Sequence, residues 1–498
     1  MKKSLLWIGG DLFNFCLAYY LKKQKDLEIH AIADVTHSLK EFLENQKLLK
    51  FDNLWFFQEN VSNNLQNPDL TYLKEIEKKF DLDLWSLINT ERYFSPQVNP
   101  FYKFSKDEIL CILENECKFL EKILFDVKPE FLILYMPNFH YDYILYKMCK
   151  KLKIQVLLLG LARGFSRRCI ISEDYDKLPK DEVNELNEYD FTNFKQLQTY
   201  LKKDDFYEET QYFKHNFVTN KKDLFKAVFR YLFSKNLNLK YYPYFGRGKL
   251  KVMIKSIWIN LLEKYRFLYL ENHSLKELKI PEPLIFFPLH VFPEGSFVLN
   301  APYFTNQLEI IKHISKSIPI NYTLIVKEHP LMNTRGWREK SFYEEIINLP
   351  NVKLVSISIP TDEILNKVKL VITISSTVGL EAAFYEKPSI VFVDTIYNEI
   401  PSVLKLEKID DLSLKIKEAL AIDVNPKDLN QFINSVEKKS FKCDLVGLTT
   451  NLTNEFFYNG FLSDVKITDK QFLKFINDNS EQFSILANNY LRLISLDD

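Results

Sequence analysis

The stretch that decides the fold is LVITISSTVGLEAAFYEKPSIVFV, residues 370–393. It opens with apolar and β-branched residues, continues through a glycine into helix-forming residues, and returns to an apolar run after Pro388. A short buried strand, a helix and a second buried strand in this order form the unit from which parallel sheets are built. The pattern therefore predicts an α/β fold with a parallel sheet.

The same alternation continues on the N-terminal side of this unit. We expect further strands at 284–287, 322–326 and 352–356, with helices at 305–316 and 362–367. Short strands separated by helices are typical of a doubly wound sheet. We therefore predict a Rossmann-like domain over residues 281–424, which binds its ligand at the carboxyl ends of its strands.

The N-terminal part of the chain shows a similar rhythm. Strands are expected at 4–8, 28–33, 130–135 and 154–159, with helices at 12–21 and 141–152. Gly9 and Gly10 form a turn after the first strand and Asp34 ends the second, but the G-x-G-x-x-G fingerprint of dinucleotide binding is missing. We predict a second Rossmann-like domain over residues 1–170, facing the other across a cleft.

The middle of the chain, residues 171–280, has a different composition. Residues 171–211 hold 12 Asp and Glu against 5 Lys, whereas residues 220–270 hold 12 Lys and Arg against 2 acids, interleaved with aromatic residues. One interpretation is a helical insertion or linker with solvated surface helices. The other is an attachment surface for an anionic lipid or glycan. Residues 425–498 are expected to form helices that pack back on the body.

The overall composition excludes several classes of protein. The 498 residues carry 66 Lys and Arg against 66 Asp and Glu, which argues against a general nucleic-acid binder. An apolar content of 46% supplies packed cores and excludes a largely disordered chain. The 6 cysteines include no CxxC pair, as in a reduced cytosolic protein without a zinc site. Glycines interrupt the apolar start of the chain, so neither a signal peptide nor a transmembrane helix is expected.

A histidine and a carboxylate follow the predicted strand at 284–287, in the segment LHVFPEGS (289–296). Because a buried His or Glu needs a partner, this pair is costly unless it is hydrogen-bonded or lies in a solvated cleft. One interpretation is a hydrogen-bonded interdomain loop. The other makes Glu294 or His290 an acid–base group or a contact to a sugar hydroxyl.

A second motif is VKEHP, residues 326–330, at the end of another predicted strand. Alternation along the strand places Lys327 and His329 on the same side, where both can face one anionic group, and Pro330 fixes the turn. Arg335 and Arg338 follow and add planar donors suited to a phosphate or carboxylate. An incidental basic patch is the alternative.

The third motif places three hydroxyl residues, Ser375, Ser376 and Thr377, between the strand at 370–374 and a helix entered at Gly379. The free N–H groups and the dipole at a helix N-terminus suit a phosphate. Glu381 lies in the first turns of the helix, within reach of ribose hydroxyls. A plain helix cap would explain one hydroxyl but not three beside a glycine.

The N-terminal domain holds further candidates. Asp11 follows the turn after the first strand and, like Glu294, is a candidate base or nucleophile for a transfer reaction. Arg92, and Asn138 with His140 after a predicted strand, are acceptor-side candidates, with ordinary packing as the alternative. No DxD-like metal cluster accompanies the three motifs, so we expect no metal site.

In order, the segments LHVFPEGS, VKEHP, SSTVGLEA and KPSIVF (387–392) resemble the bacterial capsule polysaccharide biosynthesis family, which is related to Kdo transferases and, more distantly, to bacterial sialyltransferases. This resemblance covers about residues 284–397. It implies a GT-B fold and a CMP-activated ulosonic acid donor bound mainly by the C-terminal domain. It also implies that His329 and residues 375–377 hold the CMP phosphate, that Glu381 holds the ribose, and that Lys327 assists charge neutralisation.

We therefore expect a cytoplasmic glycosyltransferase that needs no cofactor or metal. It would move a Kdo-like or sialic-acid-like sugar from CMP to a surface polysaccharide or glycolipid, with residues 220–270 near the acceptor or the inner membrane face. The alternatives are a CDP-polyol phosphotransferase and a UDP- or GDP-sugar glycosyltransferase, which differ in their donor. An alternative of another class is a non-catalytic, glycan-binding component of capsule assembly or export.

Overall fold

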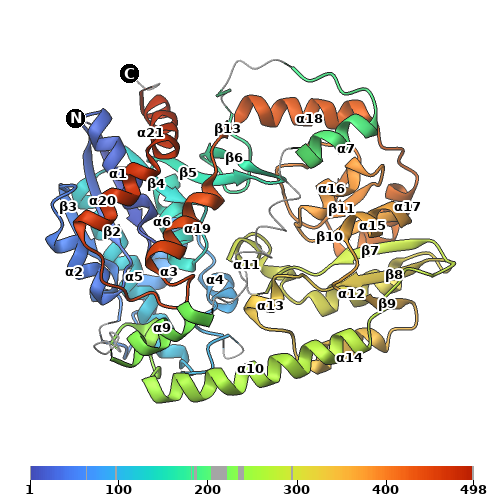
Figure 1. The fold of residues 1–498 in the computed structure, drawn as a ribbon, viewed down its shortest axis with the longest axis horizontal. Helices are drawn as coiled ribbons and strands as arrows, with labels where there is room; N and C mark the ends of the chain where they lie inside the picture. The colour runs from blue at the N-terminus through green and yellow to red at the C-terminus, as the bar shows by residue number, and fades with distance from the viewer. Residues whose placement is uncertain are drawn as a thin grey trace.

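The computed structural model describes residues 2–62, 64–95, 98–180, 182–183, 188–203, 221–233, 240–292 and 295–495. In this part of the chain two α/β domains lie side by side, each built on its own sheet (Figure 1). The predicted fold class, a GT-B-like pair of Rossmann-like domains with a helical C-terminal tail, is confirmed.

The N-terminal sheet has the strand order β13-β6-β5-β4-β1-β2-β3. Its strands are β1 (Lys3–Ile8), β2 (Glu28–Ala33), β3 (Asn53–Phe56), β4 (Phe131–Tyr135), β5 (Gln155–Ala162), β6 (Phe165–Ser172) and β13 (Phe441–Lys442). The neighbours from β5 to β3 are parallel, whereas β6 is antiparallel to β5 and β13 is antiparallel to β6. The β1 and β2 side chains are buried after the first residue of each strand, as expected when helices cover both faces of a parallel sheet.

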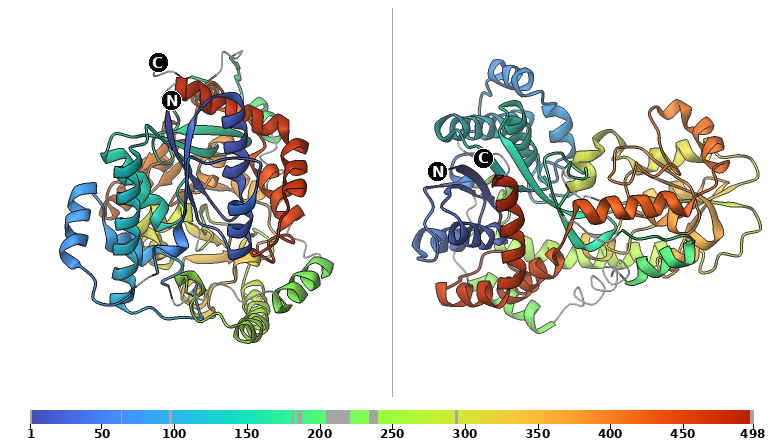
Figure 2. Two further views of the ribbon diagram at one scale, coloured as in Figure 1. Left: turned by 90° about the vertical axis from the view of Figure 1, so that its left-hand side faces the viewer. Right: turned by 90° about the horizontal axis from the view of Figure 1, so that it is seen from above.

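Helices cover both faces of this sheet (Figure 2). One face packs against α1 (Phe13–Gln24), α2 (His37–Asn45), α19 (Leu445–Phe456), α20 (Asp469–Asp478) and α21 (Ser480–Ser495). The other packs against α3 (Leu70–Phe80), α4 (Leu84–Thr90), α5 (Lys106–Val127) and α6 (His140–Lys151). The tail therefore completes the N-terminal core, with the ring centroid of Phe472 5.5 Å from that of Phe15.

The C-terminal sheet has the order β12-β11-β10-β7-β8-β9, and all its strands are parallel. Its strands are β7 (Leu284–Pro288), β8 (Thr323–Lys327), β9 (Val352–Val355), β10 (Val368–Thr373), β11 (Ser389–Val391) and β12 (Val403–Lys405). Its helices are α11 (Gly295–Asn300), α12 (Gln307–Ser317), α13 (Met332–Arg335), α14 (Lys340–Ile347), α15 (Thr361–Lys367), α16 (Val378–Phe384) and α17 (Leu412–Leu420). The strand order reverses between β7 and β10, which is where an open α/β sheet binds ligands.

Two segments cross between the domains. After the C-terminal sheet, α18 (Pro426–Lys439) packs with α7 (Phe194–Lys203) against α16 before the chain returns to the N-terminal sheet as β13. A buried ion pair of 2.8 Å between Arg168 Nη1 and Glu437 Oε2 joins β6 to α18. In the other direction, α9 (Lys221–Phe233) and α10 (Lys249–Asn272) lie along one edge of the molecule, and α10 runs beneath both domains (Figure 1).

The β5–β6 hairpin is one of the elements that the alternation of strands and helices did not predict. Ala162 pairs with Phe165, so Arg163 and Gly164 alone form the turn, and Gly164 has a φ of 88°. A tight two-residue turn favours positive φ, which glycine adopts without steric cost. The turn projects from the carboxyl end of β5 and carries Arg163 toward the C-terminal domain.

Candidate active site

The three motifs meet at the carboxyl ends of three neighbouring strands. His290 follows β7, His329 follows β8, and Ser375 follows β10, the strands that flank the reversal of strand order. The Nε2 atom of His290 lies 3.2 Å from Thr373 Oγ1 and accepts a 3.3 Å hydrogen bond from the Ser375 amide. The first and third motifs are thus in direct contact.

His290 is a buried, neutral imidazole. Burial lowers its pKa to about 3, and the nearby positive charges of Arg163 and Arg338 act in the same direction. Its ring stacks on Phe297 with 4.7 Å between centroids, and its main-chain N–H donates to Gln307 Oε1 at 2.8 Å. Because Nε2 accepts from the Ser375 amide, His290 holds the hydroxyl turn in place and is a weak base at neutral pH.

The His-Pro turn is organised by Glu328, a residue within VKEHP to which sequence analysis gave no role. Its buried Oε2 accepts from Arg338 Nε at 2.9 Å and from the Tyr343 hydroxyl at 2.8 Å, and its Oε1 accepts from the His329 amide at 2.9 Å. Arg338 also donates to the His290 carbonyl at 2.6 Å. Glu328 therefore joins the turn after β8 to the segment after β7.

His329 presents a hydrogen-bond donor. Burial, followed by the charges of Lys327 and Arg338, lowers the pKa of His329 to about 4, so the ring is neutral near pH 7. The Leu331 amide donates to its Nδ1 at 3.1 Å, which places the ring proton on Nε2. Pro330 begins the turn that leads into α13, and the side chain of Arg335 lies outside the described part of the structure.

Lys327 is buried, and its side chain points toward a neighbouring loop and not, as predicted, toward an anionic group shared with His329. Its ammonium donates to the Ile359 carbonyl at 2.5 Å and lies 3.5 Å from Thr361 Oγ1, in the loop that opens α15. Its positive charge still lowers the pKa of His329. Lys327 thus contributes to the local potential while its side chain fastens a neighbouring loop.

The hydroxyl turn bonds largely to itself and to its surroundings. The Ser376 amide donates to Thr373 Oγ1 at 3.2 Å, and the Val378 amide donates to Ser376 Oγ at 3.3 Å. The Thr377 hydroxyl donates to Glu381 Oε1 at 3.4 Å. These are long hydrogen bonds, so a stronger acceptor such as a phosphate can replace them.

Gly379 has a packing role in this turn. A Cβ at this position would lie 3.0 Å from the Tyr397 hydroxyl and 3.1 Å from Thr373 Cγ2. The Tyr397 hydroxyl donates to the Ser376 carbonyl at 2.5 Å, so the same ring also fixes the turn. Only glycine allows α16 to approach β10 and Tyr397 this closely.

Arg163 reaches the hydroxyl turn from the N-terminal domain. Its Nη1 donates to the Ser375 carbonyl at 3.0 Å, and its Nε lies 2.8 Å from Asp176 Oδ1. Sequence analysis missed this residue, although an Arg-Gly pair between two apolar runs is a signal for a hairpin turn. Through Arg163 the carboxyl ends of β5 and β10 meet.

Carboxylates gather at the carboxyl ends of β1 and β2 and at the start of α6 in the N-terminal domain. Asp11 accepts from the Phe13 amide at 3.1 Å, and burial raises its pKa. Asp34 accepts from the hydroxyls of Tyr141 and Tyr241, each at 2.9 Å, and burial raises its pKa as well. Burial raises the pKa of Asp142 to about 7. Raised carboxyl pKa values are a property of general bases that work near neutral pH.

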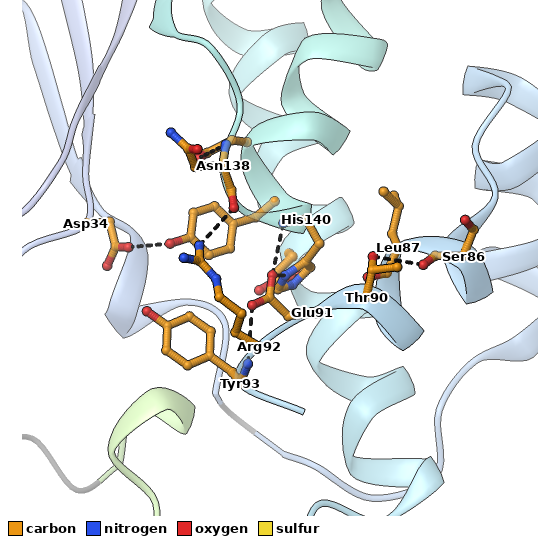
Figure 3. A network of polar contacts seen from close by, with 12 residues as sticks. Asp34, Ser86, Leu87, Thr90, Glu91, Arg92, Tyr93, Asn138 and His140 are labelled. Atoms are coloured by element: carbon orange, nitrogen blue, oxygen red, sulfur yellow. Dashed lines mark hydrogen bonds and ion pairs between the residues drawn. The ribbon is translucent and has the colours of Figure 1, made fainter. Parts of the chain in front are cut away.

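The acceptor-side candidates Arg92, Asn138 and His140 lie in the same part of the N-terminal domain as Asp34 (Figure 3). Arg92 Nη2 donates to the Asn138 carbonyl at 2.9 Å, and the Arg92 guanidinium covers the Phe139 ring at 4.3 Å from its centroid. His140 is fully buried, with Nδ1 2.7 Å from Glu91 Oε2 and Nε2 2.8 Å from Glu116 Oε2. Both ring nitrogens are engaged, so His140 has a structural role, whereas Arg92 and Asn138 lie closer to solvent.

Glu294, which with Asp11 was one of the two candidate carboxylates of the sequence analysis, lies outside the described residues. Among the residues that the structure describes, no cluster of three or more His, Cys, Asp and Glu side chains has metal-site geometry. Likewise, no helix in the described ranges is both long and apolar enough to cross a membrane.

Two Rossmann-like domains, with ligand-type motifs at the carboxyl ends of the C-terminal strands, define a GT-B-like protein. Residues 209–401 match the family "Capsule polysaccharide biosynthesis protein", which confirms the predicted resemblance and supports the predicted enzyme class, a glycosyltransferase. Among curated proteins, none matches the chain.

Similar solved structures belong to two kinds of protein. The UDP-GlcNAc 2-epimerase from Methanocaldococcus jannaschii is 14% identical, over 88% of this chain and 98% of that chain, with a TM-score of 0.27. The beta Kdo 2,7 transferase KpsC of Thermosulfurimonas dismutans is 13% identical, over 73% of this chain and 91% of that chain, with a TM-score of 0.31. At these TM-scores neither match carries an argument about function.

Proposed function

We propose that the protein is a glycosyltransferase that moves a CMP-activated ulosonic acid, Kdo-like or sialic-acid-like, to a surface polysaccharide or glycolipid. The observation that carries this proposal is the meeting of His290, His329 and the hydroxyl turn at the reversal of strand order in the C-terminal sheet. This is the ligand-binding edge of an open α/β sheet, and it lies within the segment that matches the capsule family.

The donor phosphate is assigned to the space between the His-Pro turn and the hydroxyl turn. His329 supplies a neutral Nε2–H donor, and residues 375–377 supply hydroxyls and amides whose present hydrogen bonds are long. Arg163 and Arg338 border this space and add positive charge. Glu381, which accepts from Thr377, is the candidate partner of the ribose hydroxyls.

The acceptor hydroxyl is assigned to the N-terminal domain, where a carboxylate removes its proton. Asp11 fits this role because it follows β1 at the carboxyl edge and because burial raises its pKa. The proton passes to the carboxylate as the acceptor oxygen bonds to the anomeric carbon. The bond from that carbon to the phosphate oxygen breaks, and CMP leaves with the negative charge, which Arg163 and His329 stabilise.

Calorimetric titration with CMP, CDP, UDP and GDP, with and without magnesium, tests this proposal. We expect selective, magnesium-independent binding of CMP, and about tenfold to hundredfold weaker binding in His329→Ala and Ser376→Ala, because each removes a hydrogen bond to a charged group. The matched controls are His313→Ala, at an exposed position of α12, and Ser317→Ala, at the end of the same helix. Both should bind CMP normally.

The outcomes separate the alternatives. Unchanged CMP affinity in both site variants would overturn the phosphate assignment. Preference for CDP points to a polyol phosphotransferase, and preference for UDP or GDP points to another sugar donor. If no nucleotide binds, the protein is better explained as a non-catalytic glycan-binding component.

A further inference from the structure

Two helices outside the candidate active site expose most of the large apolar side chains on the described surface. Within the described residues, 22 large hydrophobic side chains are exposed, and 14 of them lie on α9 or α10. Leu250 is 75% exposed, Ile254 68%, and Trp258 62%. In the 24 residues of α10, Leu270 is the one buried side chain that the structure describes. A helix that packs on the core of a soluble protein usually buries an apolar stripe. In α10 the apolar stripe is exposed instead.

Seven of the eight exposed large apolar residues of α10 form a continuous stripe, and the eighth, Ile259, lies on another side of the helix. The stripe consists of Leu250, Ile254, Ile257, Trp258, Leu261, Tyr265 and Leu268. With about 3.6 residues per turn, these positions fall within about 100° of one another around the helix and extend about 27 Å along it. The stripe is therefore one apolar side of α10, and it points away from the protein.

The protein holds α10 near its two ends. Lys251 and Lys255 donate to the carbonyls of Phe101 and Pro100 in the N-terminal domain. Near the other end, Arg266 Nη1 donates to the Trp337 carbonyl at 3.1 Å, and the ring of Phe267 packs 5.1 Å from that of Trp337. The middle, residues 257–261, is exposed at every position.

The charge of this surface identifies the chemistry of its partner. α10 carries five Lys and Arg residues against two Glu, and α9 carries four against one Asp. Lys264, beside the stripe, is exposed, as are Lys226 and Arg230 on α9. An apolar face with aromatic residues and flanking lysines is the pattern of a helix that lies in the interface of an anionic bilayer.

The shape of the surface also fits a flat partner. α9 and α10 lie at the same lower edge of the molecule in Figure 1. One plane can therefore contact both helices. α9 adds Phe225 and Phe233, each 75% exposed, and Phe229, 58% exposed.

We propose that α9 and α10 dock the protein on an anionic lipid bilayer, with the apolar stripe of α10 inserted among the headgroups. The described part of α10 does not span the membrane, because its apolar window is interrupted by charges. Docking by the segment that joins the domains leaves both sheets on one side of the bilayer. The proposal does not depend on the identity of the sugar donor.

Vesicle flotation of the whole protein tests the proposal. The lipids are phosphatidylcholine alone, or phosphatidylcholine with about 30% phosphatidylglycerol, at low and high salt. The triple variant Ile254→Gln, Trp258→Gln, Leu261→Gln removes the centre of the stripe. Because these side chains are exposed, we expect normal thermal unfolding and an unchanged CMP titration.

The matched control changes three exposed apolar residues elsewhere, as Leu70→Gln, Ile320→Gln and Leu414→Gln, which are 58%, 105% and 67% exposed. We expect wild type and control to float with anionic vesicles at low salt, and the stripe variant to partition at least about tenfold less, since affinity follows the inserted apolar area. The proposal is overturned if wild-type protein does not float with anionic vesicles, or if the stripe variant floats as well as the control. It is also overturned if wild type is a dimer and the stripe variant a monomer, because the stripe then covers a second copy.

Discussion

Because of the buried imidazole of His140, we expect the unfolding free energy of the N-terminal domain to decrease as the pH rises above neutral. Burial lowers its pKa, but the carboxylates of Glu116 and Glu91 outweigh burial and raise the pKa of His140 from 6.5 to about 10. In the same contact His140 lowers the pKa of Glu91, against the effect of burial. The folded state therefore holds an imidazolium between two carboxylates, at 2.7 Å and 2.8 Å.

The direction of this pH dependence follows from the number of protons bound in the folded and unfolded states. Between pH 6.5 and about 10 the folded protein keeps a proton that the unfolded chain has lost. The stabilisation is complete below the unfolded pKa, and it declines as the pH rises until the folded pKa is passed. One bound proton corresponds to about 1.4 kcal/mol per pH unit, so about 2 kcal/mol of unfolding free energy is lost between pH 7 and pH 8.5.

Thermal unfolding followed at several pH values between 7 and 8.5 measures this loss. The upper limit keeps the assay below the ordinary thiol pKa, because burial raises the pKa of Cys16 and Cys149 and these thiols add their own dependence at higher pH. We expect the midpoint to fall by about 4–8 °C for a transition of the size of the N-terminal domain.

Variants test whether His140 causes the change of unfolding free energy with pH. Glu116→Gln removes one of the two carboxylates and should flatten the dependence. His140→Gln should remove most of it, at a cost of about 3–5 kcal/mol, because two buried carboxylates lose their partner. A smaller slope remains from Asp142, whose pKa burial raises to about 7. His37→Gln, which removes a half-exposed imidazole beside Glu41, is the control. If Glu116→Gln and His140→Gln, measured wherever they fold, keep the wild-type slope, then His140 is not protonated and the assignment is wrong.

Two further predictions concern the candidate active site. Gly379→Ala should lower the unfolding free energy by about 1–3 kcal/mol, because its Cβ would crowd the Tyr397 hydroxyl at 3.0 Å. In a double-mutant cycle Tyr397→Phe should recover part of that cost. Additive costs would contradict the crowding argument. Glu328→Gln removes the charge that holds Arg338, so it should weaken CMP binding and lower the unfolding free energy by about 1.5–3 kcal/mol. Tyr343→Phe removes one neutral donor to the same carboxylate and should lower the unfolding free energy by about 0.5–1.5 kcal/mol. Equal losses in chemical denaturation and in calorimetry for these two variants would contradict the role given to Glu328.

Local patterns were sufficient to predict the strands and helices that follow the rhythm of a doubly wound sheet. The apolar run at 370–374 corresponds to β10, and the run at 28–33 corresponds to β2. The addition of β13 was not predictable in this way, because it depends on pairing across more than 250 residues, as in the Phe441–Cys169 pair. The β5–β6 hairpin is local, but its antiparallel return after Gly164 departs from the strand–helix alternation. A two-residue strand such as β13 carries no periodicity of its own.

The candidate site divides in a similar way. The positions of His329 and Ser375 at strand ends followed from the sequence, because carboxyl ends of parallel strands share an edge. The direction of Lys327 did not follow, since a long side chain at the end of a strand can turn to any nearby acceptor, and here the Ile359 carbonyl takes it. Arg163 was missed because its partner, Ser375, lies 212 positions away.

The two domains contrast electrostatically in a way that fits the proposed transfer from a charged donor to an acceptor hydroxyl. Around the C-terminal motifs the histidines are neutral, and the charges that lower the pKa of His329, those of Lys327 and Arg338, are positive, which suits a phosphate. At the carboxyl edge of the N-terminal sheet the raised pKa values belong to carboxyl groups, among them Asp11 and Asp34, which suits proton removal. Glu381, beside Thr377, is assigned to the ribose hydroxyls, so a second carboxylate acting as base at the phosphate would add repulsion there, and a carboxylate in the other domain avoids that cost. The base is therefore best sought in the N-terminal domain, and Asp11→Asn should abolish transfer while CMP affinity is retained.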